Sequence, residues 1–259
     1  MNNKKLSSWL WVSAIAVYAF LYLPLAIVII YSFNDSKLNA EWVGFTFKWY
    51  ELLFNDGPML QAAWNSLVIA TATSFFATIF GTLAGLAMHK YKLRLLPVLV
   101  LTPLALPEIL MGVSLLIFFV LLNMTLGMVS ITLAHISFCI GFVAIVVRSR
   151  LAGMDESLVE AARDLGASPL DAFRLVTLPL IMPGVIAGAL MAFTLSIDDF
   201  VITFFTAGAG ASTLPLQIYS MIKIAVTPEV NAISTLLMLL TLALIVAASK
   251  LAPGAFRAN

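Results

Sequence analysis

Charged residues are scarce in this 259-residue sequence. Only 10% of the residues are charged while 62% are hydrophobic, and the mean hydropathy is +1.05. In soluble domains about a quarter of the residues are charged. The composition therefore excludes an ordinary soluble domain and predicts an all-α integral membrane protein.

The sequence also lacks the motifs of the common catalytic and metal sites. It has no G-x-x-x-x-G-K-[ST] phosphate loop and no H-E-x-x-H motif, so we expect no ATP hydrolysis, cofactor or metal on this chain. Its single cysteine, Cys139, allows no internal disulfide and is expected to be a small buried hydrophobe. His89 and His135 have no plausible ligand or nucleophile partner in the sequence, which favours a structural role for each. A net charge of +1 without a clustered basic face argues against a nucleic-acid partner.

Six apolar stretches are long enough to cross a membrane, which takes roughly 20 mostly apolar residues. They cover about 9–31, 63–88, 96–121, 128–147, 181–206 and 231–249. The first is longer than the roughly 7 to 15 apolar residues of a cleavable signal peptide, so we expect a retained anchor. No linker divides the chain, which predicts one transmembrane domain over residues 1–259.

Lysine and arginine indicate how this bundle is oriented. Eleven of the 14 fall in alternate loops or tails together with both termini: Lys4, Lys5, Lys90, Lys92, Arg94, Arg148, Arg150, Arg163, Arg174, Lys250 and Arg257. The positive-inside rule places that side in the cytoplasm. We therefore expect cytoplasmic N and C termini, a cytoplasmic loop at about 149–180 and an external loop at about 32–62. A second external segment, 207–230, is expected to be partly re-entrant or to lie on the surface.

Three acids lie inside the predicted spans. Glu108 belongs to the third span, where Pro103 and Pro107 open backbone hydrogen bonds, and Asp198 and Asp199 belong to the fifth. A charge at the centre of a bilayer costs about 2.5 to 3.5 kcal/mol on insertion scales, so such acids usually face a water-filled path or a partner. No span core contains a lysine or arginine, so we expect the compensating cation to come from outside the chain, as its cargo.

The fifth span adds a polar stripe beside its acids. At about 100° per residue, four side chains fall in one narrow wedge of the helical wheel: Ser196, Asp199, Thr203 and Thr206. The alternatives are that Asp198 and Asp199 are interfacial residues and that Glu108 makes a purely structural hydrogen bond.

The cytoplasmic loop has the pattern of a helix-turn-helix. Ser157 and Glu160 have the spacing of a capping box, and Gly166 suits the left-handed residue that ends a helix, so we expect one helix at about 157–165. Ser168 can cap a second helix, with Pro169 at its first position and Asp171 following, and Pro179 as its far limit.

The same loop resembles the EAA loop of ABC importer permeases, whose pattern is E-A-A, three residues, G, nine residues and I-x-L-P. The matching residues are Glu160, Ala161, Ala162, Gly166, Val176, Leu178 and Pro179, with Val176 in place of isoleucine. The resemblance implies the six-transmembrane-helix fold of type I ABC importer permeases, and a short coupling helix at Glu160, Ala161 and Ala162 that docks on an ATPase. The alternatives are an ordinary cytosolic helical loop and a Glu160 that merely caps its helix.

The whole chain further resembles the second permease subunit of bacterial spermidine/putrescine ABC importers. The resemblance rests on Phe47–Tyr50, Ser196–Asp199, Tyr219–Met221 and Pro228–Ala232. It implies an inner-membrane heterodimer with a second, similar permease, two cytosolic ATPase subunits that carry ATP and magnesium, and a periplasmic polyamine-binding protein.

A polycationic cargo would explain the acids and the aromatic external loop. Aromatic faces attract amines by roughly 0.5 to 2 kcal/mol, although the same loop also has the composition of an interfacial aromatic belt. We therefore expect a substrate pathway that includes Trp49, Glu108, Ser196, Asp198 and Asp199. The rival hypotheses are an ABC importer permease for iron, thiamine or an oxyanion, a proton- or sodium-coupled secondary transporter, and a channel or structural membrane protein.

Overall fold

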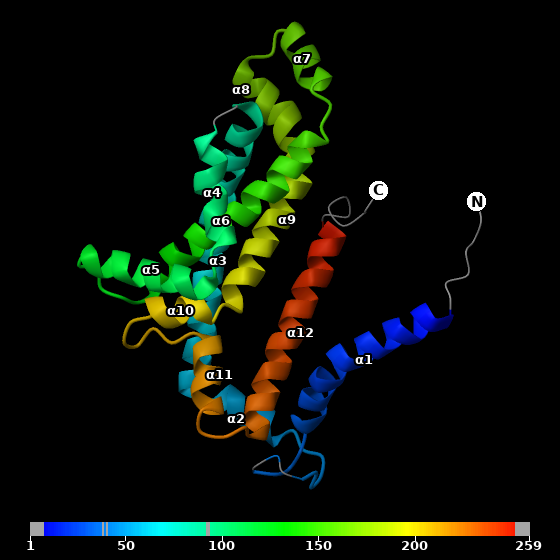
Figure 1. Cartoon of the computed structure of the whole chain (residues 1–259), viewed down its shortest axis with the longest axis vertical. Helices are drawn as coiled ribbons and strands as arrows, with labels where there is room; N and C mark the ends of the chain where they lie inside the picture. Colours follow the sequence, from blue (N-terminus) through cyan, green and yellow to red (C-terminus); the bar gives the residue numbers. More distant parts are fainter. Residues whose placement is uncertain (1–7, 38, 40, 92–93, 252–259) are drawn as a thin grey trace. The chain divides into compact units, whose positions relative to one another are not determined.

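The computed structural model describes residues 8–37, 39, 41–91 and 94–251, and it is helical almost throughout (Figure 1). The helices are α1 (Ser8–Tyr31), α2 (Lys48–Asn55), α3 (Gly57–Lys90), α4 (Leu95–Ala105), α5 (Glu108–Leu121), α6 (Met128–Ala152), α7 (Ser157–Asp164), α8 (Pro169–Ala172), the π-helix η1 (Phe173–Thr177), α9 (Leu178–Ile197), α10 (Val201–Thr206), α11 (Leu214–Ile222) and α12 (Pro228–Leu251). Within the described residues, the extended pairing is limited to one isolated bridge between Asn34 and Phe45. The predicted all-α class is confirmed.

Five helices are long and apolar enough to cross a membrane, and each covers all or most of one predicted stretch. They are Trp9–Tyr31, Gly57–Lys90, Met128–Ala152, Pro169–Ile197 and Pro228–Val246. The sixth is a bent pair, so the described chain has five candidate spans, or six if that pair counts as one.

The third predicted span is broken rather than continuous. Helices α4 and α5 meet at an angle of 110°, so the prediction of one helix over 96–121 is wrong. The cause is Pro107, because a proline disfavours the helical region for the residue before it, and Leu106 is extended with φ −82° and ψ 140°. Pro103 is tolerated inside α4. Glu108, which was expected in mid-span, becomes the first residue of α5.

The fifth predicted span is interrupted too. Helix α9 ends at Ile197, and α10 begins only at Val201, so a continuous helix over 181–206 is wrong. The Asp199 carboxylate accepts the backbone N–H of Thr203 at 2.8 Å, which offers the chain an alternative to the helical ladder. Residues 198–200 are called the α9–α10 break below.

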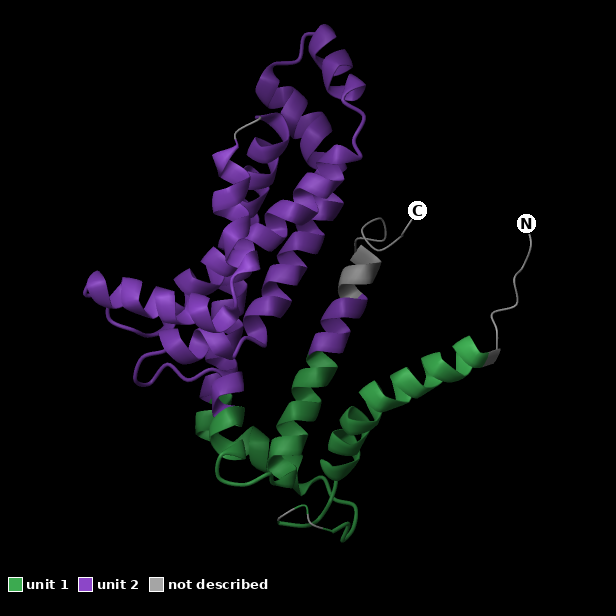
Figure 2. Ribbon diagram, in the orientation of Figure 1, with its two compact units in different colours: residues 1–60, 218–240 green, residues 61–217, 241–259 purple. Residues whose placement is uncertain are grey.

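The chain divides into two compact units (Figure 2). One consists of residues 1–60 and 218–240, and the other of residues 61–217 and 241–259. The single transmembrane domain predicted over 1–259 stays a prediction. The segment 207–230 contains α11, and its placement in or on the membrane also stays a prediction.

In the first unit, the loop that was predicted to be external, at about 32–62, is held by its own polar and aromatic contacts. The buried Asn34 side chain donates to the Glu41 carbonyl at 2.8 Å and accepts from the Val43 backbone at 2.9 Å. Four rings then pack against one another, with centroids 5.0 to 6.3 Å apart: Phe33, Phe45, Phe47 and Tyr50. These contacts explain why a loop without regular strands keeps a defined shape.

In the second unit, α6 supplies half of the buried residues of the main hydrophobic core. Its packing partners are α4, α5, α9 and α10. Glycines in two other helices allow close approach to the same α6 residue, because a Cβ atom at Gly81 or Gly188 would lie 2.6 or 3.0 Å from Val143 atoms. Cys139 is fully buried in this core, which confirms the prediction of a small buried hydrophobe.

The loop at about 149–180, called the coupling loop below, folds as two helical segments joined at Gly166. Gly166 has a φ of +92°, which confirms the predicted left-handed position. The Ser168 side chain caps α8 by accepting from the Asp171 backbone at 3.2 Å, as predicted. The capping box of Ser157 and Glu160 does not form, since α7 starts at Ser157 and the Ser157 backbone donates to Asp155 instead. The Asp155 carboxylate accepts hydrogen bonds from both the side chain and the backbone of Ser157, and these lower its pKa.

Pro179 does not end the second helix, contrary to the prediction. Helices α8, η1 and α9 run on as one helical segment, Pro169–Ile197. A proline has no N–H and clashes with the carbonyl four residues earlier in an α-helix. The chain passes this point through a π turn, in which the Leu178 N–H donates to the Phe173 carbonyl five residues back.

Candidate functional site

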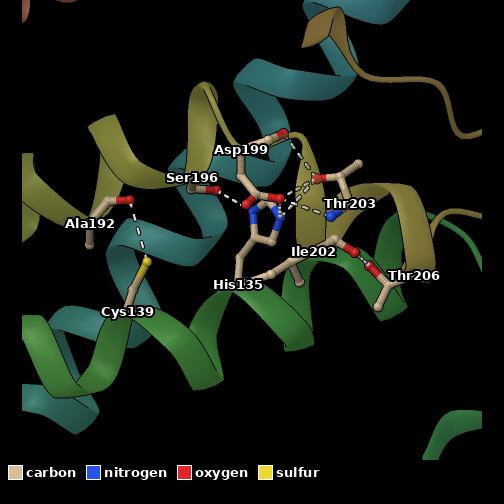
Figure 3. Close-up of polar contacts among 8 residues, drawn as sticks. All are labelled: His135, Cys139, Ala192, Ser196, Asp199, Ile202, Thr203 and Thr206. Atoms are coloured by element: carbon tan, nitrogen blue, oxygen red, sulfur yellow. Dashed lines mark hydrogen bonds and ion pairs between the residues drawn. The ribbon is translucent and has the colours of Figure 1, made fainter. Parts of the chain in front are cut away.

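A buried polar cluster occupies the junction of α6, α9 and α10 (Figure 3). His135 comes from α6, Ser196 from the last turn of α9, Asp199 from the α9–α10 break and Thr203 from α10. The sequence brings them together because α6 packs on both α9 and α10. The side chains of His135 and Asp199 are only 2% and 7% exposed.

His135 is the centre of this cluster. Its Nδ1 is hydrogen bonded to Ser196 Oγ at 2.7 Å. Its Nε2 lies 2.9 Å from Thr203 Oγ1 and 3.1 Å from Asp199 Oδ1. Thr203 also donates to Asp199 Oδ1, from its hydroxyl at 2.9 Å and from its backbone at 2.8 Å. The predicted wedge thus brings together Ser196, Asp199 and Thr203, although the helix is broken between them.

Thr206, the last member of the predicted wedge, is buried but does not join this cluster. Its hydroxyl donates to the Ile202 carbonyl at 2.8 Å, within its own helix. The helical wheel therefore identified the buried face correctly. The hydrogen bonds made on that face depend on the α9–α10 break.

Sequence reasoning expected no metal or nucleophile partner for His135 and favoured a structural role, but it did not anticipate the hydrogen bonds of the ring. It also expected the cation that compensates the intramembrane acids to come from outside the chain, whereas Asp199 receives hydrogen bonds from within the chain. The partners are 61 and 64 residues away along the chain, at Ser196 and Asp199. The available signal was a titratable ring within a predicted membrane span.

Asp198 and Glu108 are placed differently from Asp199. Both side chains belong to exposed residues. Helix α5, which Glu108 begins, packs on α10, the helix that follows Asp198 across the break. Both broken spans therefore contribute an accessible acid to one region of this unit.

Trp49 belongs to the other unit, where its side chain is buried and hydrogen bonded. It is 8% exposed, and its Nε1 donates to the Asn34 carbonyl at 2.8 Å. The Lys48 ammonium lies 5.4 Å from the centroid of its ring. The ring thus already takes part in a cation–π contact of the kind predicted for cargo, while its place in a substrate pathway stays a prediction.

The coupling loop presents the predicted docking residues at its surface. Glu160, Ala161 and Gly166 are exposed, and Ala162 is half-buried. At the other end of the motif Pro179 is exposed and Leu178 is half-buried. Leu165, at the end of α7, is 90% exposed, so a large apolar side chain stands free at the turn between the two segments.

Comparison with known proteins gives one family and consistent relatives. Residues 77–253 match the model of the binding-protein-dependent transport system inner membrane component. The spermidine/putrescine transport system permease protein PotC of Escherichia coli K12 is 44% identical over 247 residues, which cover 94% of each chain. The putrescine transport system permease protein PotI of the same strain is 42% identical over 250 residues, which cover 92% of this chain and 89% of that one.

Solved structures show the same fold at lower sequence identity. A chain of a bacterial ABC transporter involved in the import of alginate has a TM-score of 0.74 at 15% identity, covering 96% of each chain. A chain of the MetNI methionine ABC transporter in an inward-facing conformation has a TM-score of 0.67 at 21% identity, covering 78% of this chain and all of that one. The helical arrangement is that of an ABC importer permease.

Proposed function

Because this chain belongs to the family of binding-protein-dependent transport system inner membrane components, we propose that it forms half of the pathway by which an ATP-driven importer moves polyamines. It is a multi-pass inner-membrane permease and not itself an enzyme. Relatives at 44% and 42% identity are named as spermidine/putrescine and putrescine permeases, which supports the same cargo here.

The observation that carries the cargo assignment is the pair of exposed acids at the two broken spans. Glu108 starts α5 directly after the first bend, and Asp198 lies in the α9–α10 break. A polyamine is a flexible chain of separated ammonium groups, so it needs separated carboxylates of this kind. An oxyanion importer would be opposed by the same charges.

The proposed partners are a second, similar permease, two cytosolic ATPase subunits and a periplasmic polyamine-binding protein. ATP and magnesium would bind to the ATPase subunits. The proposed orientation has both termini and the coupling loop in the cytoplasm, which is supported by the distribution of lysine and arginine.

In the proposed cycle, the loaded binding protein docks on the external loops while ATP closes the two ATPase subunits. The exposed face of α7, with Glu160, Ala161 and the half-buried Ala162, would fit a cleft in the ATPase, where small alanine side chains allow close approach. Closure of the ATPases would then turn the permeases from inward- to outward-facing, and the polyamine would enter the pathway past Asp198 and Glu108.

Uptake of labelled spermidine and putrescine tests the proposal. Cells lacking their own polyamine-importer permease of this type, but holding its partners, would receive either the native chain or the variant Asp198→Asn with Asp199→Asn. We expect uptake to return only with the native chain, at equal amounts of both proteins in the membrane. If neither the native chain nor the variant restores uptake, the polyamine assignment is overturned while the importer family stays in place. If the two restore uptake equally, the two aspartates are not part of the pathway.

A further inference from the structure

We infer that His135 is a positioning residue, which turns Asp199 inward and leaves Asp198 as the acid of this pair that meets the cargo. The inference rests on the proposed function and adds to it a division of labour between two neighbouring aspartates. The basis is the geometry around the α9–α10 break (Figure 3).

Asp199 is occupied by donors from its own chain. Three of them converge on its Oδ1: the Thr203 backbone at 2.8 Å, the Thr203 hydroxyl at 2.9 Å and His135 Nε2 at 3.1 Å. The side chain is 7% exposed, whereas Asp198, one residue earlier, is exposed. A cargo amine would have to displace these donors before it reached Asp199 from within the pathway.

The arrangement of protons identifies His135 as a donor. An ionised carboxylate only accepts, so a hydrogen bond between Asp199 and His135 requires a proton on Nε2. The Thr203 hydroxyl has one proton, which it gives to Asp199, and its oxygen can accept from the same Nε2. The ring therefore has to present its Nε2 face to both residues, and the bond from Nδ1 to Ser196 holds that orientation.

His135 also joins the two sides of the break from a third helix. Ser196 lies just before residues 198–200 and Thr203 lies in the helix that follows them. Both are bonded to one ring on α6, whose own position is set by the core around Cys139 and Val143. Because Asp198 lies between the two anchored ends, its direction depends on the ring.

The consequence for recognition concerns the number of charges that the cargo meets. Three acids close together would repel one another and would hold a cation indiscriminately. With the Asp199 carboxylate hydrogen bonded within the chain, the exposed acids of this region are Asp198 and Glu108. Removal of His135 would release Asp199 and misplace Asp198, so it would weaken cargo recognition rather than the driving step.

The test is the kinetics of polyamine uptake by the assembled importer, with variants at His135. His135→Leu removes all three hydrogen bonds of the ring at similar volume, and His135→Gln keeps an amide donor close to the position of Nε2. We expect KM to rise about tenfold for His135→Leu and about threefold for His135→Gln, as the loss of charge-assisted hydrogen bonds implies. The maximal rate per assembled importer should stay within about twofold of native, since the driving step is untouched.

The network is checked by combining His135→Leu with Asp199→Asn. Residues that act through one hydrogen-bond network are not additive, so the double variant should have a KM no higher than the worse single variant. Ser137→Ala is the matched control on the same helix, because Ser137 is exposed and donates only to the Leu133 carbonyl of its own helix. Its KM should equal that of the native chain.

A native KM in both His135 variants, with only the amount of importer reduced, would overturn the inference and leave His135 as a packing residue. Additive effects in the double variant would also overturn it. If neither His135 variant accumulates, Thr203→Ala removes the shared hydroxyl and Thr203→Ser restores it, and the same KM criterion decides. Failure of the native chain to import polyamines at all would instead overturn the proposed function.

Discussion

Asp198 and Asp199 are adjacent in the sequence, yet their environments differ. Asp199 is buried against His135 and Thr203, and Asp198 is exposed. A regular helix would separate them by only about 100° around its axis. The α9–α10 break separates them further, because the Asp199 side chain is used to satisfy the backbone of Thr203.

Cysteine labelling distinguishes the two positions. Asp198→Cys in the assembled importer should react with a positively charged methanethiosulfonate added from outside, and spermidine should slow that reaction severalfold because cargo covers the residue. The native chain is the control, since its one cysteine, Cys139, is fully buried and should not react. Faster labelling of Asp199→Cys than of Asp198→Cys would contradict this prediction.

Only part of the candidate site could be predicted from the sequence, and the reason is physical. Residues that share a helical face, such as Ser196, Asp199 and Thr203, follow from local periodicity. The ring that joins them comes from α6, and nothing in local periodicity specifies which side chain of a distant helix packs there. Tertiary packing places His135 in the cluster, so the sequence showed the acids without their internal partner.

At the scale of helices and turns, the coupling loop follows its local chemistry closely. Gly166 takes the left-handed conformation and Ser168 caps the following helix, because both depend on a few neighbouring residues. The effects of Pro107 and Pro179 could not be predicted from a few neighbouring residues. The same residue type bends the chain by 110° at one site and is accommodated by a π turn at the other, so the presence of proline alone does not specify which outcome occurs.

Replacement of Gly166 tests the role of that turn. A φ of +92° costs an L-residue about 1 to 2 kcal/mol and a β-branched one more, so Gly166→Val should shift α7 relative to α8. We expect the ATPase to be lost from the complex on affinity purification while the permease still inserts in the membrane.

Gly153→Ala is the control in the same loop. The nearest atom to a Cβ at Gly153 is the Arg150 carbonyl oxygen at 3.8 Å, and its φ is −95°, so alanine fits there. Full co-purification of the ATPase with Gly166→Val would refute the coupling role of this turn.

At the scale of the whole molecule, the spans were predictable because their lengths depend on the bilayer rather than on packing. Five helices of 19 to 34 residues each cover all or most of one predicted stretch. Their helical type and approximate position follow from hydropathy alone. The division into residues 1–60 with 218–240 and the remainder does not, because it depends on contacts between distant segments.

Fusions to reporter proteins test the proposed orientation. Green fluorescent protein at the C terminus should fluoresce, because it matures in the cytoplasm, and alkaline phosphatase inserted in the external loop at 32–62 should be active. The physical reason is that 11 of the 14 basic residues share one side with the termini. The reverse pattern of activities would invert the orientation and place the coupling loop away from any cytosolic ATPase.

The π turn at Phe173–Thr177 has a mechanical consequence. Because the helix passes through it without stopping, one segment of 29 residues starts at Pro169, beside the proposed ATPase-docking turn, and ends at Ile197, next to Asp198. Such a segment is roughly 43 Å long at about 1.5 Å per residue. In the proposed cycle this segment would act as a lever arm, because displacement of its coupling-loop end would move Asp198 at the other end. Work done by the ATPase subunits would then need no separate relay to reach the substrate.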